Sequence, residues 1–238
     1  MAKESGLNVR LYVEGNDLSG DANSLDGLGY TQEAFDTTTL SQAAVSRISG
    51  RADGTVSVSA FYDAASTHIS AVATANSGKL PTTDQNVMVP MGSAVGSESV
   101  SFIARQSDYT VSGSTGSPIT VSVSYAIDAV APSFGAMLTA HDDTFSSAGS
   151  GTTVDNSASS ASGGAGFLQV FSVGSGTVGF KIEHSSNGSS WADLLTFATA
   201  TTVGAQRVTC SGTINRYVRI TTTGTFTNAK IACALIRD

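Results

Sequence analysis

The residues with the most reactive side chains in this chain form no catalytic motif. His68, His141 and His184 show no paired metal-binding spacing. His141 is followed by Asp142 and Asp143, a combination that can hold a metal, but we favour a solvated corner of the chain there. The sequence therefore predicts neither a metal site nor a cofactor.

An acidic segment carries Asp17-x-Ser19-x-Asp21, which begins like a calcium loop. The expected glycine does not follow, and Leu28 stands where such a loop ends in a bidentate Glu. The chain also has no Gly-x-Ser-x-Gly elbow, no phosphate-binding loop and no His-Glu-x-x-His sequence. We therefore expect that the protein is not an enzyme.

The two cysteines, Cys210 and Cys233, each fall on the apolar phase of an expected strand. Two interpretations are open: buried free thiols, or a cross-strand disulfide of a secreted protein. The N-terminal residues after Lys3 contain no apolar stretch of the kind found in a secretory signal. We therefore prefer free thiols.

Composition places the chain among β proteins with two units. Of its 238 residues only 13% are charged, and Ser, Thr, Gly and Val dominate. No apolar run reaches the roughly 18 residues of a membrane helix, so we expect no membrane insertion. Residues 1–134 hold 6 basic and 13 acidic residues, whereas residues 135–238 hold 6 of each. This asymmetry indicates a first domain over 1–131, a linker over 132–138 and a second domain over 139–238.

Alternation of apolar and polar residues predicts the elements, with one helix over 66–76. Two long polar segments, 14–29 and 79–96, are expected to be irregular. The predicted strands are 7–13, 30–38, 43–48, 55–62, 99–105, 119–127, 167–173, 177–184, 192–198, 206–210, 216–221 and 229–236. The fold class is therefore mainly β, with a sandwich or barrel first and an antiparallel β-sandwich after it.

Three pieces of the first unit occur in a familiar order: the run from Leu11 to Asp21 (LYVEGNDLSGD), Asp36-Thr-Thr-Thr39, and the run from Asp53 to Asp63 (DGTVSVSAFYD). Over about residues 7–128 the chain resembles tail tube proteins of long-tailed, non-contractile bacteriophages (siphoviruses), especially those of actinobacterial hosts. The resemblance implies a structural virion protein, assembled in the bacterial host cytoplasm. Its copies would form rings, usually hexameric, that stack into the tail tube used in genome ejection.

The resemblance also implies partners. The protein would contact itself and the tape measure, terminator and tip proteins of the tail, while DNA passes through the tube without specific binding. A negatively charged lumen would repel the phosphates. We expect six acids to face that lumen or the ring interfaces: Glu14, Asp17, Asp21, Asp26, Asp36 and Asp53. We also expect segments 14–29 and 79–96 to be arms that order on a neighbouring subunit or the next ring, with apolar contacts from Val87, Met88, Val89 and Met91.

The second unit carries the run from Lys181 to Leu195 (KIEHSSNGSSWADLL) and the run from Asn215 to Ile220 (NRYVRI). It resembles β-sandwich modules of discoidin and carbohydrate-binding type. Trp191, the only Trp, is interpreted as a core anchor, with a ligand platform as the alternative. A possible face for host-surface glycans comprises Trp191, Arg216, Tyr217 and Arg219. Val218 and Ile220 should point into the core, and Arg216 should pair with a carboxylate.

Other functions stay open beside the tail tube. A capsid decoration protein or minor tail protein could bind host-surface glycans through the second unit. An extracellular adhesin is disfavoured by the expected lack of a signal segment, and a hydrolase by the missing catalytic residues.

Overall fold

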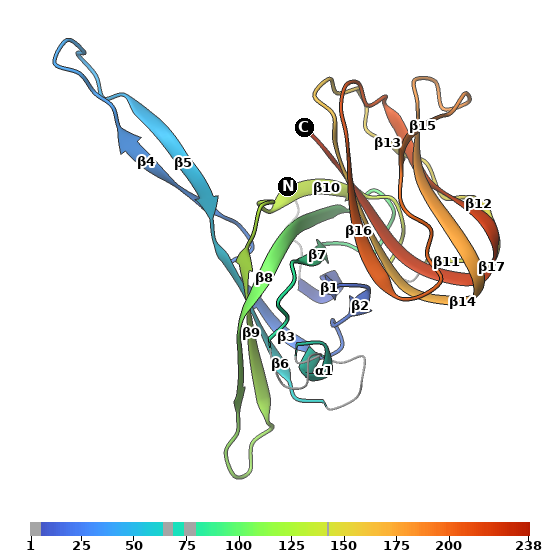
Figure 1. Cartoon of the computed structure of the whole chain (residues 1–238), viewed down its shortest axis with the longest axis horizontal. Helices are drawn as coiled ribbons and strands as arrows, with labels where there is room; N and C mark the ends of the chain where they lie inside the picture. The colour runs from blue at the N-terminus through green and yellow to red at the C-terminus, as the bar shows by residue number, and fades with distance from the viewer. Residues whose placement is uncertain (1–5, 64–68, 74–79, 142) are drawn as a thin grey trace.

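The computed structural model describes residues 6–63, 69–73, 80–141 and 143–238. It is mainly β and antiparallel, which confirms the predicted fold class (Figure 1). Within these residues no helix has the length and apolarity needed to cross a bilayer. A 3-10 turn, Gly6–Asn8, precedes the first strand.

The first unit is built on seven strands. They are β1 (Tyr12–Val13), β2 (Asn16–Asp17), β3 (Ala22–Asp26), β6 (Thr55–Phe61), β7 (Gln85–Pro90), β8 (Glu98–Ser112) and β9 (Thr120–Ile127). Strands β6 and β9 alternate buried and partly exposed residues, so they follow the period-two pattern predicted for them. Helix α1 (Ile69–Ala73) packs Ile69 and Ala73 into this core. The rest of the predicted helix, 66–68 and 74–76, lies outside the described residues.

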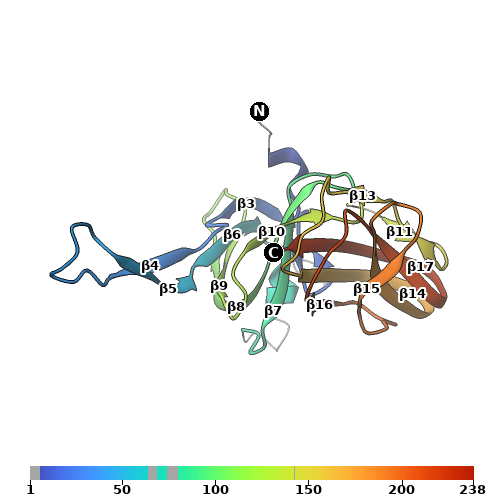
Figure 2. The same cartoon turned by 90° about the horizontal axis from the view of Figure 1, so that it is seen from above.

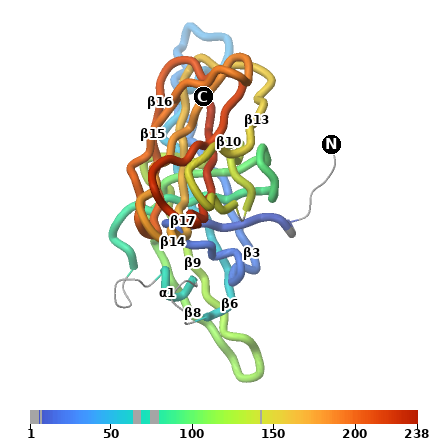
Figure 3. The backbone as a smooth tube through the Cα atoms, turned by 90° about the vertical axis from the view of Figure 1, so that its right-hand side faces the viewer, coloured from blue at the N-terminus to red at the C-terminus, as the bar shows by residue number. Residues whose placement is uncertain are grey.

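A separate two-stranded sheet leaves this unit. It consists of β4 (Thr31–Asp36) and β5 (Arg47–Asp53), and it projects away from both cores (Figures 1 and 2). We call residues 31–53 the arm. Figure 3 shows the arm and the hairpin of β8 and β9 extending toward opposite ends of the molecule.

The second unit is organised by two very long strands, β14 (Gly164–Ser185) and β17 (Tyr217–Arg237), which pair along almost their whole length. A bulge between Val170 and Ser172 and the positive φ of Gly176 and Gly224 let this ribbon curve around its own core. The remaining strands are β11 (Thr144–Phe145), β12 (Gly149–Ser150), β13 (Val154–Asp155), β15 (Ala192–Thr196) and β16 (Gly204–Cys210). Each of the two long strands was predicted as two shorter ones, which is wrong.

The predicted linker 132–138 is not irregular, because it contains β10 (Ser133–Met137). This strand pairs with β8 on one side and β17 on the other, so a single 15-stranded sheet runs through both units. A third apolar cluster, which includes Tyr12, Met88 and Phe167, joins their two cores. The two units therefore form one continuous body.

A buried polar contact completes this junction. Gln169 of β14 is fully buried, and its Nε2 donates to the Asn86 carbonyl of β7 at 2.9 Å. Its Oε1 accepts the Gly15 N–H at 2.6 Å. Gly15 has φ +77°, and a Cβ there would lie 2.6 Å from the Gly204 nitrogen, so only glycine fits this turn against the second unit.

Candidate assembly surface

The arm has little support from the rest of the fold. Every residue of β4 is exposed, and in β5 only Gly50 and Ala52 are partly covered. The two strands pair antiparallel with Phe35 directly opposite Ile48. A two-stranded hairpin alone is at best marginally stable in water. This geometry therefore indicates an element that is completed by another surface.

Apolar side chains are displayed along the arm. Phe35 and Ile48 form a cross-strand pair on one face and are 47% and 58% exposed. Near the tip, Val45 is 59% exposed and Leu40 is 109% exposed, so Leu40 touches almost nothing in its own chain. Exposed apolar groups gathered on one element are typical of an interaction site.

The tip of the arm is held by its own hydrogen bonds. The Thr37 N–H donates to the Ser46 carbonyl at 2.9 Å, and the Thr39 N–H donates to Gln42 Oε1 at 2.9 Å. Hydrogen bonds from the side chain and N–H of Thr38 lower the pKa of Asp36. The loop that presents Leu40 therefore has hydrogen bonds of its own within the arm.

A second uncovered apolar surface lies at the free end of the sheet formed by β6, β9 and β8. Val111 pairs with buried Val121, and the Tyr62 N–H donates to the Ile119 carbonyl at 3.0 Å. In β9 the buried phase runs through Val121 and Val123, and Ile119 continues it. Tyr62, Val111 and Ile119 are nevertheless about half exposed, because the core does not extend to this end.

A concave apolar surface of about 590 Å³ lies at the root of the arm. Its partly exposed apolar lining includes Val9, Leu25, Leu28 and Met91, and the buried residues Leu11 and Val89 lie beneath them. We call this surface the hollow. It is formed by the segments around β1, β3 and β7, and Leu25 and Leu28 directly precede the arm in the chain.

The structure ties two of the six predicted lumen or interface acids into the fold; the prediction is wrong for buried Asp21 and stays a prediction for partly exposed Glu14. Glu14 is half-buried, and its carboxylate accepts the Asn86 N–H at 2.5 Å while burial raises its pKa. Asp21 is 7% exposed, and its Oδ2 accepts the Ile69 N–H at 2.8 Å, which satisfies a free donor at the start of α1. Both carboxylates serve the fold.

The other four acids, Asp17, Asp26, Asp36 and Asp53, are exposed. Asp17 lies 3.8 Å from Arg10 and accepts hydrogen bonds from Ser19. Asp36 and Asp53 lie at the ends of the two arm strands. That these acids face a lumen or a ring interface stays a prediction.

The predicted arm at 79–96 is wrong over its described residues, 80–96, and the one at 14–29 is wrong because that segment forms β2 and β3 of the large sheet. The apolar run in 80–96 forms β7, in which Val87, Met88 and Val89 are fully buried and inaccessible to solvent. Strand β7 pairs with β1 and β8 in the middle of the sheet, and Met91 packs on the same core. A short apolar run can be a strand buried on both faces, which is the case here.

In the second unit, Trp191 is not the expected core anchor. It is half-buried, and the Arg219 guanidinium lies 4.0 Å from the centre of its ring. The core positions are instead Val218 and Ile220, as predicted from their phase. Because Arg219 covers one face of the indole, that face of the ring is not available to a ligand.

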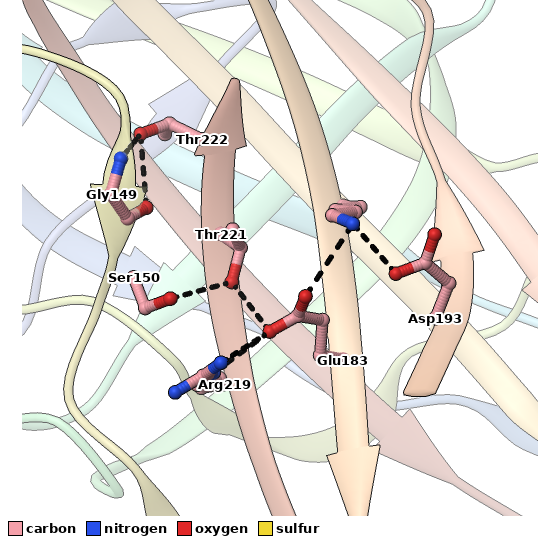
Figure 4. Close-up of polar contacts among 8 residues, drawn as sticks. Gly149, Ser150, Glu183, Asp193, Arg219, Thr221 and Thr222 are labelled. Carbon is pink, nitrogen blue, oxygen red and sulfur yellow. Dashed lines mark hydrogen bonds and ion pairs between the residues drawn. The ribbon is translucent and has the colours of Figure 1, made fainter. Parts of the chain in front are cut away.

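Arg219 belongs to a polar network on the sheet (Figure 4). Its Nη2 lies 2.7 Å from Glu183 Oε2, which also accepts the Thr221 hydroxyl at 2.9 Å. Lys181 lies 3.4 Å from Glu183 and 2.7 Å from Asp193. Burial alone would raise the pKa of Glu183, but the bonds from Arg219 and Thr221 leave it below its ordinary value.

Arg216 pairs with a carboxylate, as predicted. Both its Nε and Nη2 lie 2.6 Å from the oxygens of Asp155, and its guanidinium lies 4.9 Å from the centre of the Tyr217 ring. The hydrogen bond from Arg216 lowers the pKa of Asp155 to about 2. Trp191, Arg216, Tyr217 and Arg219 thus lie on neighbouring parts of one module, and their glycan binding stays a prediction.

Where the structure describes them, the remaining reactive residues form no shared site. The expected solvated corner at His141 is wrong, because His141 is buried, and His68 and Asp142 lie outside the described residues. Among the described residues, no three His, Cys, Asp or Glu side chains are grouped for a metal. Cys210 and Cys233 are free thiols, and burial raises the pKa of both.

The arm itself was predicted only as two strands, 30–38 and 43–48, without its projection from the body. The sequence does carry a signal for the projecting arm, namely isolated apolar residues in a polar segment. They are Phe35, Leu40, Val45 and Ile48, which the structure leaves exposed. Their neighbours Gln32, Glu33, Thr37–Thr39 and Ser41 offer no second apolar stripe that could form a core.

No family model and no curated protein matches the chain. Among solved structures, it is similar to a chain in the tail of an empty GTA particle with C6 symmetry (TM-score 0.39, 16% identity), over 55% of this chain and 97% of that one. It is similar to the SPP1 Dit protein of a phage hub adsorption apparatus (TM-score 0.38, 13% identity), over 97% and 99% of the two chains. It is also similar to a chain in the PVC sheath–tube complex of an extracellular contractile injection system (TM-score 0.43, 12% identity), over 54% and 89%. With these TM-scores, the similarities do not assign a function to this chain.

Proposed function

We propose that the protein is a structural subunit of a bacteriophage tail, and that its copies assemble as stacked rings into the tail tube through which DNA passes. The resemblance of residues 7–128 to tail tube proteins supports the tail. The observation that carries self-assembly is the arm, a projecting two-stranded hairpin with exposed apolar side chains.

Two different apolar surfaces of the chain support assembly into rings or stacks. The arm and the end of the β8–β9 hairpin extend toward opposite ends of the molecule (Figure 3). A contact between unlike surfaces of identical copies is heterologous, so it either closes into a ring or continues as a stack. Such contacts would also cover the open edges of the arm strands, which otherwise pair without control.

The charge distribution is consistent with a conduit for DNA. The acidic excess lies in the first unit, with 13 acidic and 6 basic residues, which gives a net charge of -7. Asp17, Asp26, Asp36 and Asp53 are exposed in that unit. A negative wall would repel phosphates within about 8–10 Å and keep DNA from adhering. In this proposal the second unit is an outer module of the tube.

The test is a variant in which the arm is replaced by a two-residue Asn-Gly turn between Tyr30 and Gly54. The strands at its root, β3 and β6, remain paired, so this variant should keep the far-ultraviolet circular dichroism of the parent body. Negative-stain microscopy and sedimentation velocity should show rings or tubes for the wild type and monomers for the variant. Tubes formed equally by the armless variant would refute the role of the arm. A wild type that stays monomeric at high concentration would refute the function.

A further inference from the structure

The turn between β14 and β15 contains two neighbouring residues that can react with each other. Asn187 is followed by Gly188, and this is the one Asn-Gly pair in the sequence. Glycine has no Cβ beside its backbone nitrogen, and Gly188 has a φ of +73°, which side chains disfavour. The Gly188 nitrogen is therefore sterically open to attack the Asn187 side-chain amide, a reaction that closes a five-membered ring.

One hydroxyl connects the two groups that would react. The Gly188 N–H donates to Ser185 Oγ at 3.0 Å, and the same hydroxyl donates to Asn187 Oδ1 at 3.0 Å. The Asn187 N–H also donates to this oxygen, at 3.3 Å. Ser185 is the last residue of β14, pairs with Tyr217 and is 1% exposed, so the sheet holds its hydroxyl in place.

The Asn187 side-chain carbonyl is polarised by two backbone groups as well. The N–H groups of Ser189 and Ser190 each donate to Asn187 Oδ1 at 2.9 Å. Two backbone donors on one carbonyl oxygen are the arrangement that stabilises negative charge on this atom when a nucleophile adds to the carbon. With the Ser185 hydroxyl, three donors meet the oxygen on which charge develops.

We propose that Asn187 is a site of spontaneous deamidation, in which the Ser185 hydroxyl relays the proton. The Gly188 nitrogen bonds to Asn187 Cγ, its proton passes to Ser185 Oγ, and the hydroxyl proton passes to Oδ1. The tetrahedral group then expels ammonia: the Cγ–Nδ2 bond breaks, the proton on Oδ1 moves to the leaving nitrogen, and the carbonyl reforms. The product is a cyclic imide, and the step consumes no other reactant.

Water completes the modification. Residues 187–190 are exposed, so water reaches the imide and opens its ring. Opening at one carbonyl gives an aspartyl residue, and opening at the other gives an isoaspartyl linkage, in which the main chain runs through the former side chain. Both products carry a negative charge where asparagine has none.

The modification changes the surface beside Tyr217. A Cβ on Gly188 would lie 3.8 Å from the Tyr217 ring, so the turn rests on this ring. The Arg216 guanidinium lies 4.9 Å from the centre of the same ring. The isoaspartyl form lengthens the main chain by one carbon and displaces the carbonyl that holds the Ser189 and Ser190 N–H groups. Deamidation therefore rearranges the turn next to the face predicted for glycans.

The first test compares the deamidation rates of folded variants at neutral pH. Tryptic peptide 182–207 contains no other asparagine, so its one-dalton mass increase and its isoaspartyl content report on Asn187 alone. Ser185→Ala should slow the reaction by roughly tenfold or more, because positioned proton transfer typically contributes about 10²–10⁴-fold. Ser185→Thr keeps the hydroxyl and should keep most of the rate. The matched control, Ser186→Ala at the exposed neighbouring position, should leave the rate unchanged.

The second test separates the fold from the Asn-Gly sequence. Wild-type protein unfolded in guanidinium chloride keeps the sequence but loses the relay, so it should deamidate more slowly than the folded protein. Circular dichroism checks that each variant is folded. A folded wild type that reacts no faster than the unfolded chain, or a folded Ser185→Ala variant that reacts as fast as the wild type or faster, would overturn the relay. Neither outcome bears on the proposed tail function.

Discussion

Gln169 offers the sharpest test of how the two units are joined. The substitution Gln169→Met keeps the length of the side chain and removes its amide. The native side chain lies in the junction, where it accepts the Gly15 N–H at 2.6 Å and donates to the Asn86 carbonyl at 2.9 Å and to its Oδ1 at 3.2 Å. Because Gln169 is fully buried, water does not replace these bonds easily.

The expected loss can be worked out bond by bond. The Gly15 N–H would stay buried without a partner, which costs about 1–3 kcal/mol. The Asn86 carbonyl keeps the Glu14 N–H at 3.2 Å, so losing the bond from Gln169 costs only the net value of about 1 kcal/mol. Asn86 Oδ1 also loses its bond from Gln169, at a similar net value of about 1 kcal/mol, so we expect Gln169→Met to lower the free energy of unfolding by about 3–5 kcal/mol.

Gln206→Met is the matched control. Gln206 also binds one residue through both amide atoms, accepting the Ala198 N–H at 2.7 Å and donating to its carbonyl at 3.0 Å, but it is partly exposed and these two bonds are open to solvent. Its loss should cost less than about 1 kcal/mol, because water satisfies the freed groups. Urea unfolding followed by circular dichroism measures both variants at a concentration where the protein is monomeric. Equal effects of the two substitutions would refute the buried junction.

Three further predictions concern other parts of the fold. Arg216→Ala should raise the pKa of Asp155 from about 2 toward 3.8, measured by carbon NMR titration. Because the pKa of Asp155 is lower in the folded state than in the unfolded state, the stabilisation from this pair is present above about pH 4 and is lost toward pH 2. An Asp155 pKa that stays near 2 in the variant would contradict the pairing. Gly176→Ala should lower the melting temperature far more than Gly212→Ala does. The two glycines have φ values of +83° and +82°, but only at Gly176 would a Cβ clash with the Thr225 carbonyl. Equal losses of melting temperature would exclude this clash. Asp21→Ala should lower the free energy of unfolding in urea by about 1–2 kcal/mol, because the Ile69 N–H loses the carboxylate that accepts its hydrogen bond. The control Asp26→Ala, at an exposed position, should change it very little. The reverse order would disprove the role of Asp21 in α1.

The sequence predicts best the strands that bury one face. The alternation in 55–62 and 119–127 corresponds to β6 and β9 because one side of each strand packs on the core. It fails for β7, where both faces are buried and the apolar run Val87-Met88-Val89 has no alternation to read. It also divides β14 and β17, because Gly176 and Gly224 look like turns but occupy bends within continuous strands.

The candidate site was only partly predictable. The sequence shows the acidic first unit, but it does not distinguish Asp21, which caps α1, from exposed Asp26. A signal for the junction was present in Gln169, a polar residue between Leu168 and Val170 in an apolar strand. A buried amide of this kind needs partners from a distant segment, and the sequence does not name them. The sequence also does not reveal that the arm projects from the body, because this depends on which strands the rest of the chain packs against.

Cryo-electron microscopy of the concentrated wild-type protein is the most direct test of self-assembly through the arm. The account predicts stacked rings around an open channel, with density for residues 31–53 of each copy lying against another copy. Single, unassembled molecules throughout, or rings in which these residues extend into solvent and touch no neighbour, would contradict it.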